Sequence, residues 1–152
     1  LTGTTTAAGD TVTMNSVGSI ADGNGATNNI TAGNAVLTAT GGVGTSGDPI
    51  ETTISNLEAA GGTGGVFVAN NGALTIGSIS ATVGVSATTG AITISATSPL
   101  TVAENVSTAG AITLDALEVS DAPTFADVLT VNAGVTVNST GVPILTSICR
   151  GV

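Results

Sequence analysis

A short motif that recurs along the chain is the strongest constraint on its fold. Residues 90–95 read GAITIS and residues 110–115 read GAITLD. In each motif a turn residue precedes alternating apolar and polar residues, which is the pattern of a short strand with one buried side. Related motifs are DTVTMN (10–15), NAVLTA (34–39), GGVFVAN (64–70), GALTIGS (72–78), PLTVAE (99–104), VLTVNAG (128–134) and GVTVNS (134–139). The chain is therefore predicted to repeat one structural unit made of short strands.

The spacing of the motifs distinguishes between all-β folds. Matching glycines follow at steps of 18 residues from Gly72 to Gly90, 20 to Gly110 and 24 to Gly134. A β-sandwich shows turn signals every 8–12 residues, whereas a step near 20 that holds two or three short strands corresponds to one coil of a β-solenoid. Coils that stack at the strand spacing of about 4.8 Å would give about seven coils and a rod on the order of 35 Å long. We predict one parallel β-solenoid over residues 1–152.

The alternation also predicts which side chains form the core. Ile92 and Ile94 of GAITIS are expected to point inward and Thr93 outward, and GAITLD repeats this arrangement. Hydrophobic residues make up 41% of the chain but aromatic residues only 1%, so stacked Val, Ile, Leu and Ala must fill a narrow interior. The outward threonines would stack into one ladder of hydroxyl groups: Thr75, Thr93, Thr113 and Thr130. Such a ladder raises ice binding as an alternative function, although outward threonine is also simply a good strand former.

Two longer segments resemble a known family. Residues 43–79, VGTSGDPIETTISNLEAAGGTGGVFVANNGALTIGSI, and residues 129–141, LTVNAGVTVNSTG, are similar to the repeats of filamentous-haemagglutinin-like exoproteins. These are large bacterial surface proteins and adhesins of the two-partner secretion type, and the resemblance covers most of residues 9–141. It implies a right-handed parallel β-helix within a longer extracellular array of repeats. A stalk or contact surface is then the expected function, with a receptor or glycan that the sequence does not identify.

The charged residues argue against several other functions. Ten acidic residues stand against one basic residue, Arg150, for a net charge of −9, and His, Lys and Tyr are absent. A chain with no Lys and a single Arg cannot neutralise a phosphate backbone, so nucleic-acid binding is not expected. No apolar run is long enough to span a membrane, so membrane insertion is not expected either. A carbohydrate-active β-helix enzyme remains the alternative, but a lyase needs a base to accept the proton. We therefore predict no catalytic residue and no cofactor.

One acidic segment is a weak candidate for calcium. Residues 114–127, LDALEVSDAPTFAD, hold four carboxylates, and oxygen ligands of this kind suit Ca²⁺. The candidate ligands are Asp115, Glu118, Asp121 and Asp127. An exposed acidic loop is the simpler interpretation, and neither an EF-hand loop nor a calcium-binding nonapeptide repeat is found.

Two segments depart from the repeat. Residues 41–65 lack clean alternation, and we predict an irregular loop with some strand there; a short helix beginning near Asp48 and Pro49 is the alternative. Residues 142–152, VPILTSICRGV, contain the only Cys and the only Arg. We expect this tail to lie outside the repeat and to be poorly packed, with a capping segment as the alternative.

Overall fold

The computed structural model describes residues 1–80, 84–117 and 128–141, together with the backbone of 144–148. Every regular element in these residues is a β-strand. The strands are β1 (Thr5–Ser16), β2 (Ile30–Ala39), β3 (Ile50–Thr53), β4 (Asn56–Gly61), β5 (Val66–Asn70), β6 (Leu74–Ile76), β7 (Val85–Ala87), β8 (Ile92–Ala96), β9 (Leu100–Val102), β10 (Val106–Thr108), β11 (Ile112–Ala116), β12 (Leu129–Val131), β13 (Val137–Ser139) and β14 (Ile144–Ile148). All of them pair in parallel, so the predicted parallel β-solenoid is confirmed.

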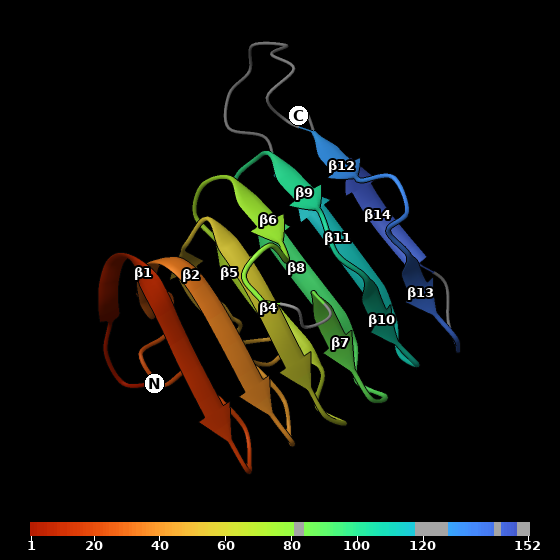
Figure 1. The fold of residues 1–152 in the computed structure, drawn as a ribbon. Coiled ribbons are helices and arrows are strands. Elements are labelled where there is room, and N and C mark those ends of the chain that lie inside the picture. The colour runs from red at the N-terminus through yellow and green to blue at the C-terminus, as the bar shows by residue number, and fades with distance from the viewer. Residues whose placement is uncertain (81–83, 118–127, 142–143, 149–152) are drawn as a thin grey trace.

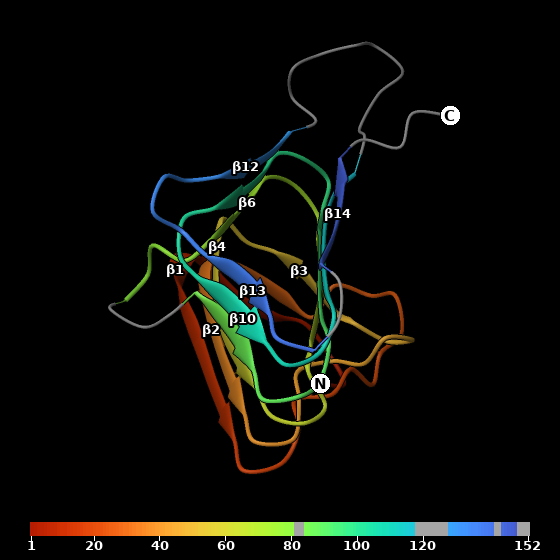
Figure 2. The same cartoon turned by 90° about the vertical axis from the view of Figure 1, so that its right-hand side faces the viewer.

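The strands form three parallel faces that run along the solenoid (Figure 1). Face 1 consists of β3, β5, β8, β11 and β14, face 2 of β6, β9 and β12, and face 3 of β7, β10 and β13. The long strand β4 turns from face 2 to face 3, because its first residues pair with β6 and its last with β7. In Figure 2, which looks along the axis from the C-terminal end, the chain turns anticlockwise as it approaches the viewer. The solenoid is therefore right-handed, as expected.

Ladders of identical or similar aliphatic residues fill the interior. On face 1, Val66 pairs with Ile92 and Ile92 with Ile112, and all three are fully buried. On face 2, Leu74 and Leu100 stack in the same way. The inward positions of Ile92 and Ile94 and the outward position of Thr93 agree with the alternation in the sequence. Because each side chain rests on a similar one in the next coil, the core closes without aromatic residues.

Stacked glycines explain why the repeated motif begins with Gly. Where the chain turns from face 3 into face 1, the backbones of successive coils lie almost in contact. A Cβ on Gly90 would lie 2.2 Å from Gly65 N, and one on Gly110 would lie 2.7 Å from Gly90 O. A Cβ on Gly141 would lie 2.6 Å from Ala109 O. The column of Gly65, Gly90, Gly110 and Gly141 is therefore required by the close approach of the coils.

The coils are longer and fewer than the sequence predicted. Ile20, Val43 and Val66 bridge one another at steps of 23 residues, and the described residues make about five turns rather than seven. The error arose because GALTIGS lies on face 2 whereas GAITIS lies on face 1. The step of 18 residues therefore compared two different faces of the solenoid. Only the 20-residue step from Gly90 to Gly110 joins equivalent positions on neighbouring coils.

Residues 41–65 combine loop and strand, as predicted, and the alternative of a short helix was wrong. Ile50–Thr53 forms β3 and Asn56–Gly61 forms β4, and no helix occurs in this segment. Ile50, Thr52 and Ile54 are buried, so a period of two is present. The period was hidden because Thr52 occupies an inward position that is normally apolar.

The prediction that the tail lies outside the repeat was wrong for the residues whose backbone is described. Ile144–Ile148 pairs residue for residue with β11 as a further parallel strand of face 1. These residues therefore continue the ladder rather than leaving it. Residues 142–143 and 149–152, which include Cys149 and Arg150, lie outside the described residues.

Candidate functional site

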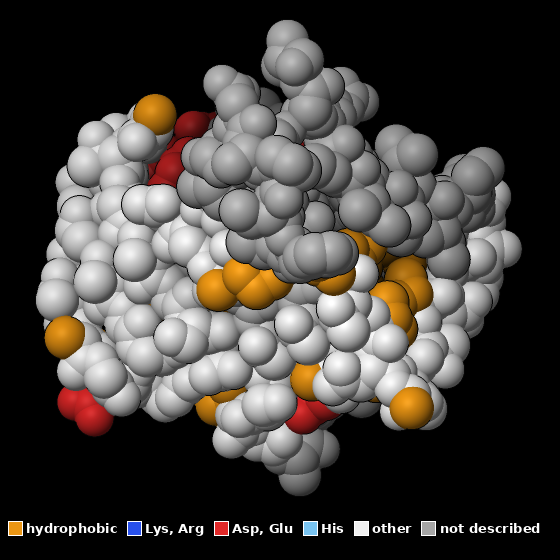
Figure 3. Space-filling view, turned by 90° about the horizontal axis from the view of Figure 1, so that it is seen from above, with side chains coloured by type: hydrophobic (Ala, Val, Ile, Leu, Met, Phe, Trp, Pro, Cys, Tyr) orange, Lys and Arg blue, Asp and Glu red, His pale blue; other side chains and the backbone are white. Residues whose placement is uncertain are grey.

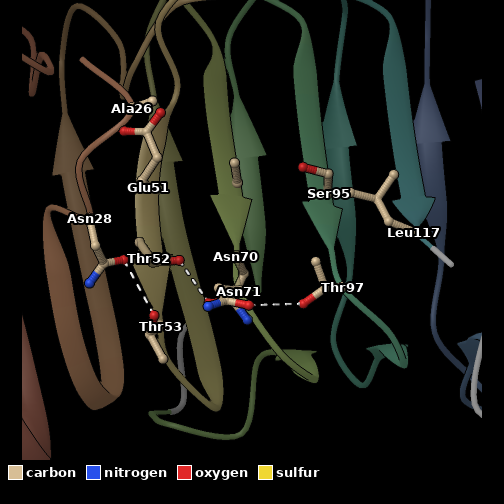
Figure 4. Close-up of a pocket in the computed structure, with 11 residues that line it drawn as sticks. Ala26, Asn28, Glu51, Thr52, Thr53, Asn70, Asn71, Ser95, Thr97 and Leu117 are labelled. Carbon is tan, nitrogen blue, oxygen red and sulfur yellow. Dashed lines mark hydrogen bonds between the residues drawn. The ribbon is translucent and has the colours of Figure 1, made fainter. Parts of the chain in front are cut away.

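A groove crosses the ends of the face 1 strands (Figure 4). It encloses about 340 Å³ and runs along the solenoid axis, because strands of successive coils contribute to its lining. Its lining residues are Ala26, Asn28, Glu51, Thr52, Thr53, Ala69, Asn70, Asn71, Ser95, Thr97 and Leu117. A second hollow of about 400 Å³ shares Thr53 and Asn71 with the first. The groove is thus lined mainly by uncharged polar side chains, with a single carboxylate.

Amide and hydroxyl side chains alternate along this groove. Thr53 Oγ1 donates a hydrogen bond to Asn28 Oδ1 at 3.4 Å, and Thr97 Oγ1 donates one to Asn71 Oδ1 at 3.3 Å. Asn28 Nδ2 is held by Ile30 O at 3.1 Å and by Thr31 Oγ1 at 2.7 Å. Each coil therefore contributes at least one polar side chain to the groove, and two pairs of these side chains are hydrogen-bonded between neighbouring coils.

Three carboxylates from two adjacent coils lie within electrostatic range of one another near one end of the groove. Asp22, Asp48 and Glu51 lie on adjacent coils and influence one another electrostatically. Burial alone would raise the pKa of Asp22, but hydrogen bonds from Asn29, from backbone N–H groups and from Asp48 hold it below 3.8. Burial and the charge of Asp22 raise the pKa of Asp48. Asp48 therefore takes up a proton at a higher pH than Asp22 does.

Glu51 belongs to the same group and faces the groove. Burial raises the pKa of Glu51 above 4.5. The hydrogen bond from the backbone N–H of Glu51 lowers this pKa, whereas the negative charges of Asp22 and Asp48 raise it further. Among the described residues, Glu51 Oε2 and Asp22 Oδ2 are buried and have no hydrogen-bond partner. No motif in the sequence had linked these three acids. The 26 residues between Asp22 and Asp48, close to one coil, were the signal that could have joined them.

Replacing Asp48 with asparagine is expected to stabilise the fold at pH 7. The folded-state pKa of Asp48 is raised, so its ionisation opposes folding above that pKa, and the penalty is absent below the ordinary value of 3.8. The melting temperature of Asp48→Asn should exceed that of the wild type at pH 7, and the difference should disappear below pH 3.8. Thermal unfolding followed by circular dichroism measures both.

Asp10→Asn is the matched control for this effect, because it removes the same charge from an exposed site on β1. It should leave the melting temperature close to that of the wild type at both pH values. An Asp48→Asn variant that is less stable than the wild type at pH 7 would contradict the raised pKa of Asp48.

A buried glutamate holds the turn that follows face 2. Glu58, on β4, is 1% exposed. Its Oε1 accepts hydrogen bonds from Ile79 N at 3.0 Å and Ser80 N at 2.7 Å, and its Oε2 accepts one from Ser80 Oγ at 2.6 Å. Glu104, two coils after Glu58, accepts a bond from Ser78 N at 3.0 Å. Burial acts to raise the pKa of Glu58, but the bonds from Ser80 and Ile79 lower it. This carboxylate therefore has a structural role.

The Glu58→Ala variant is expected to lose about 2 kcal/mol of stability at pH 7, because three backbone and hydroxyl donors lose a buried charged acceptor. The folded-state pKa of Glu58 is lowered, so its contribution is complete above 4.5 and declines as the pH falls towards the folded-state value. Urea denaturation at pH 7 and pH 3.5 should show a smaller difference at the lower pH. Glu104→Ala, which removes one bond, should cost about 1 kcal/mol. An equal loss in the two variants would contradict this account.

The threonines predicted to form one ladder lie on two faces. Thr75, Thr101 and Thr130 stack on face 2, whereas Thr93 and Thr113 stack on face 1 beside Phe67. The prediction of a single ladder of Thr75, Thr93, Thr113 and Thr130 is therefore wrong, and Thr101 was not among the predicted ladder residues. The motifs of the two faces look alike because both place threonine between two inward aliphatic residues.

The calcium candidate falls largely outside the described residues. Glu118, Asp121 and Asp127 lie in the undescribed segment, and Asp115 lies on β11, where its Oδ1 is buried without a hydrogen-bond partner among the described atoms. Within the described residues, no three His, Cys, Asp or Glu side chains form a group that could hold a metal ion.

The described surface carries few charges. In Figure 3 the acidic side chains on the face seen from above occur at separate places, and most of that surface is uncharged. The described residues include no Lys, Arg or His, and they contain no helix that could cross a membrane. No family model, curated protein or solved structure matches the chain.

Proposed function

We propose that this chain is a rigid structural segment of an extracellular bacterial surface protein, an adhesin or exoprotein, in which it serves as a stalk or contact surface and not as a catalyst. The observation that carries the proposal is the uninterrupted parallel ladder of face 1. Its five strands are joined in register, and the ladders of the other two faces run beside it. Such a solenoid sets a fixed distance between whatever lies at its two ends.

Two further features support this function. The resemblance of residues 43–79 to filamentous-haemagglutinin-like repeats suggests an array of such coils. In addition, β1 pairs with β2 on one side and with no other described strand. An unpaired edge of this kind accepts another parallel strand, as a neighbouring repeat would supply.

Limited proteolysis of intact cells tests the location. Proteinase K is added to the bacterium that carries the gene, and released peptides are identified by mass spectrometry. Peptides of this chain should be released from intact cells together with known surface proteins, while a cytoplasmic marker stays protected. Release that requires cell lysis would overturn the proposal.

The two rival functions predict different results with the purified protein. A carbohydrate-active enzyme would release new reducing ends or unsaturated products from polysaccharides, including pectin-like substrates. An ice-binding protein would produce thermal hysteresis at micromolar concentration. Neither result is expected. A clear product or a clear hysteresis would replace the structural function with the corresponding rival.

A further inference from the structure

We propose that the groove over the ends of β3, β5 and β8 binds a short stretch of a neutral glycan lying along the solenoid axis. This deepens the proposed function, since it assigns a ligand class to the contact surface. The groove lies within the size range of small-molecule sites at about 340 Å³. Its long direction crosses the strands (Figure 4), so a chain-like ligand would meet one coil after another.

The lining matches the chemistry of sugars. A sugar presents hydroxyl groups that both donate and accept hydrogen bonds, together with apolar C–H surfaces. Asn28, Thr53, Asn71 and Thr97 supply amide and hydroxyl groups from successive coils. These side chains recur at the coil spacing of about 4.8 Å, which is comparable with the length of one sugar ring. Ala69 and Leu117 supply apolar surface, and Leu117 is 38% exposed.

The polar groups are held in place before any ligand binds. The bonds from Thr53 to Asn28 and from Thr97 to Asn71 limit the rotation of four side chains, which lowers the entropy cost of binding. Asn71 is exposed, and no hydrogen bond joins its Nδ2 to another described residue. The Asn71 amide therefore presents a donor to the groove that is available to a sugar hydroxyl.

The charge of the groove selects among glycans. Glu51 is the single charged residue in the lining, no cation lies among the lining residues, and the chain has a net charge of −9. A polyanionic glycan would meet repulsion without a compensating Lys or Arg. A neutral oligosaccharide avoids that repulsion and still supplies hydroxyl groups to the amide and hydroxyl side chains of the lining. The occupant is therefore an uncharged sugar chain.

Titration of the ¹⁵N-labelled full chain tests the proposal. The probes are cellotetraose, maltotetraose and the tetramer of N-acetylglucosamine, with tetragalacturonic acid as the anionic comparison. At least one neutral probe should bind with a Kd of about 1 mM and shift the backbone amide signals of Thr53, Asn71 and Thr97. Tetragalacturonic acid should bind more weakly than that probe.

Two double variants separate the groove from the rest of the surface. Thr53→Val with Asn71→Ala removes polar groups from the groove and should weaken the neutral probe about tenfold, since at least two hydrogen bonds are lost. Thr75→Val with Thr101→Val makes a comparable change on face 2 and should leave the Kd unchanged. The melting temperatures of both variants confirm that they fold.

Four results would overturn the glycan site. The first is that no neutral probe gives a saturable shift up to about ten times that Kd, and the second is that the shifts are confined to another face. The third is that tetragalacturonic acid binds more tightly than every neutral probe. The fourth is that the two double variants lose the same amount of affinity for the neutral probe. The proteolysis of intact cells measures the location of the chain independently of glycan binding. Failure of the glycan site therefore leaves the structural function standing, and a failed location leaves the binding result intact.

Discussion

Replacing Gly90 with alanine is expected to lower the free energy of unfolding by about 4 kcal/mol, because the added methyl group would overlap the backbone of the previous coil. The added Cβ would lie 2.2 Å from Gly65 N and 2.5 Å from Gly65 Cα. These are backbone atoms of the previous coil and cannot rotate away as a side chain would. The two coils must separate, and the parallel bonds between β5 and β8 weaken with them. Urea denaturation followed by circular dichroism measures the loss.

Gly47→Ala is the matched control for this substitution. Nothing lies within 4 Å of a Cβ at Gly47, and its φ lies outside the left-handed region. The expected change in the free energy of unfolding is within about 0.5 kcal/mol. If Gly90→Ala were as stable as Gly47→Ala, the coils would not approach each other as closely as described, and the glycine column would need another explanation.

The architecture could be predicted from the sequence because it depends on local periodicity. Alternation in GAITIS and GAITLD correctly placed Ile92 and Ile94 inside and Thr93 outside, and the small, aliphatic composition agreed with a narrow core. The assignment of motifs to faces failed, since face 1 and face 2 use nearly the same alternation. A single motif shows which side of a strand is buried but not to which of the three faces the strand belongs.

The candidate groove could not be predicted, because it depends on the register between coils. Asn28, Thr53, Asn71 and Thr97 are separated by unequal numbers of residues, and only the pairing of the strands brings them into one row. Thr52 and Asn70 obscured the pattern in a different way. Both occupy inward positions of face 1, where polar residues are rare unless they are hydrogen-bonded.

Asn70→Ala is therefore expected to be about as damaging as Gly90→Ala, with a loss of about 4 kcal/mol. Asn70 is 3% exposed. Its Oδ1 accepts hydrogen bonds from Thr52 Oγ1 at 2.8 Å and Ile54 N at 3.0 Å. Its Nδ2 donates to Ile54 O at 3.2 Å, Gly72 O at 3.0 Å and Ala73 O at 3.4 Å. Alanine would leave all of these groups without this partner where the chain turns out of face 1.

Asn71→Ala and Asn70→Asp show whether the bonds of the Asn70 amide cause this loss. Asn71 is the exposed neighbour, and its replacement should change stability by no more than about 0.5 kcal/mol. Asn70→Asp keeps the shape and the acceptor, but at pH 7 it directs a negative charge at three carbonyl oxygens. It should be at least as unstable as Asn70→Ala at pH 7 and should recover part of the loss at pH 4, where a protonated carboxyl donates one bond. Equal stability of Asn70→Asp and the wild type at pH 7 would show that the donors of Asn70 do not hold this turn.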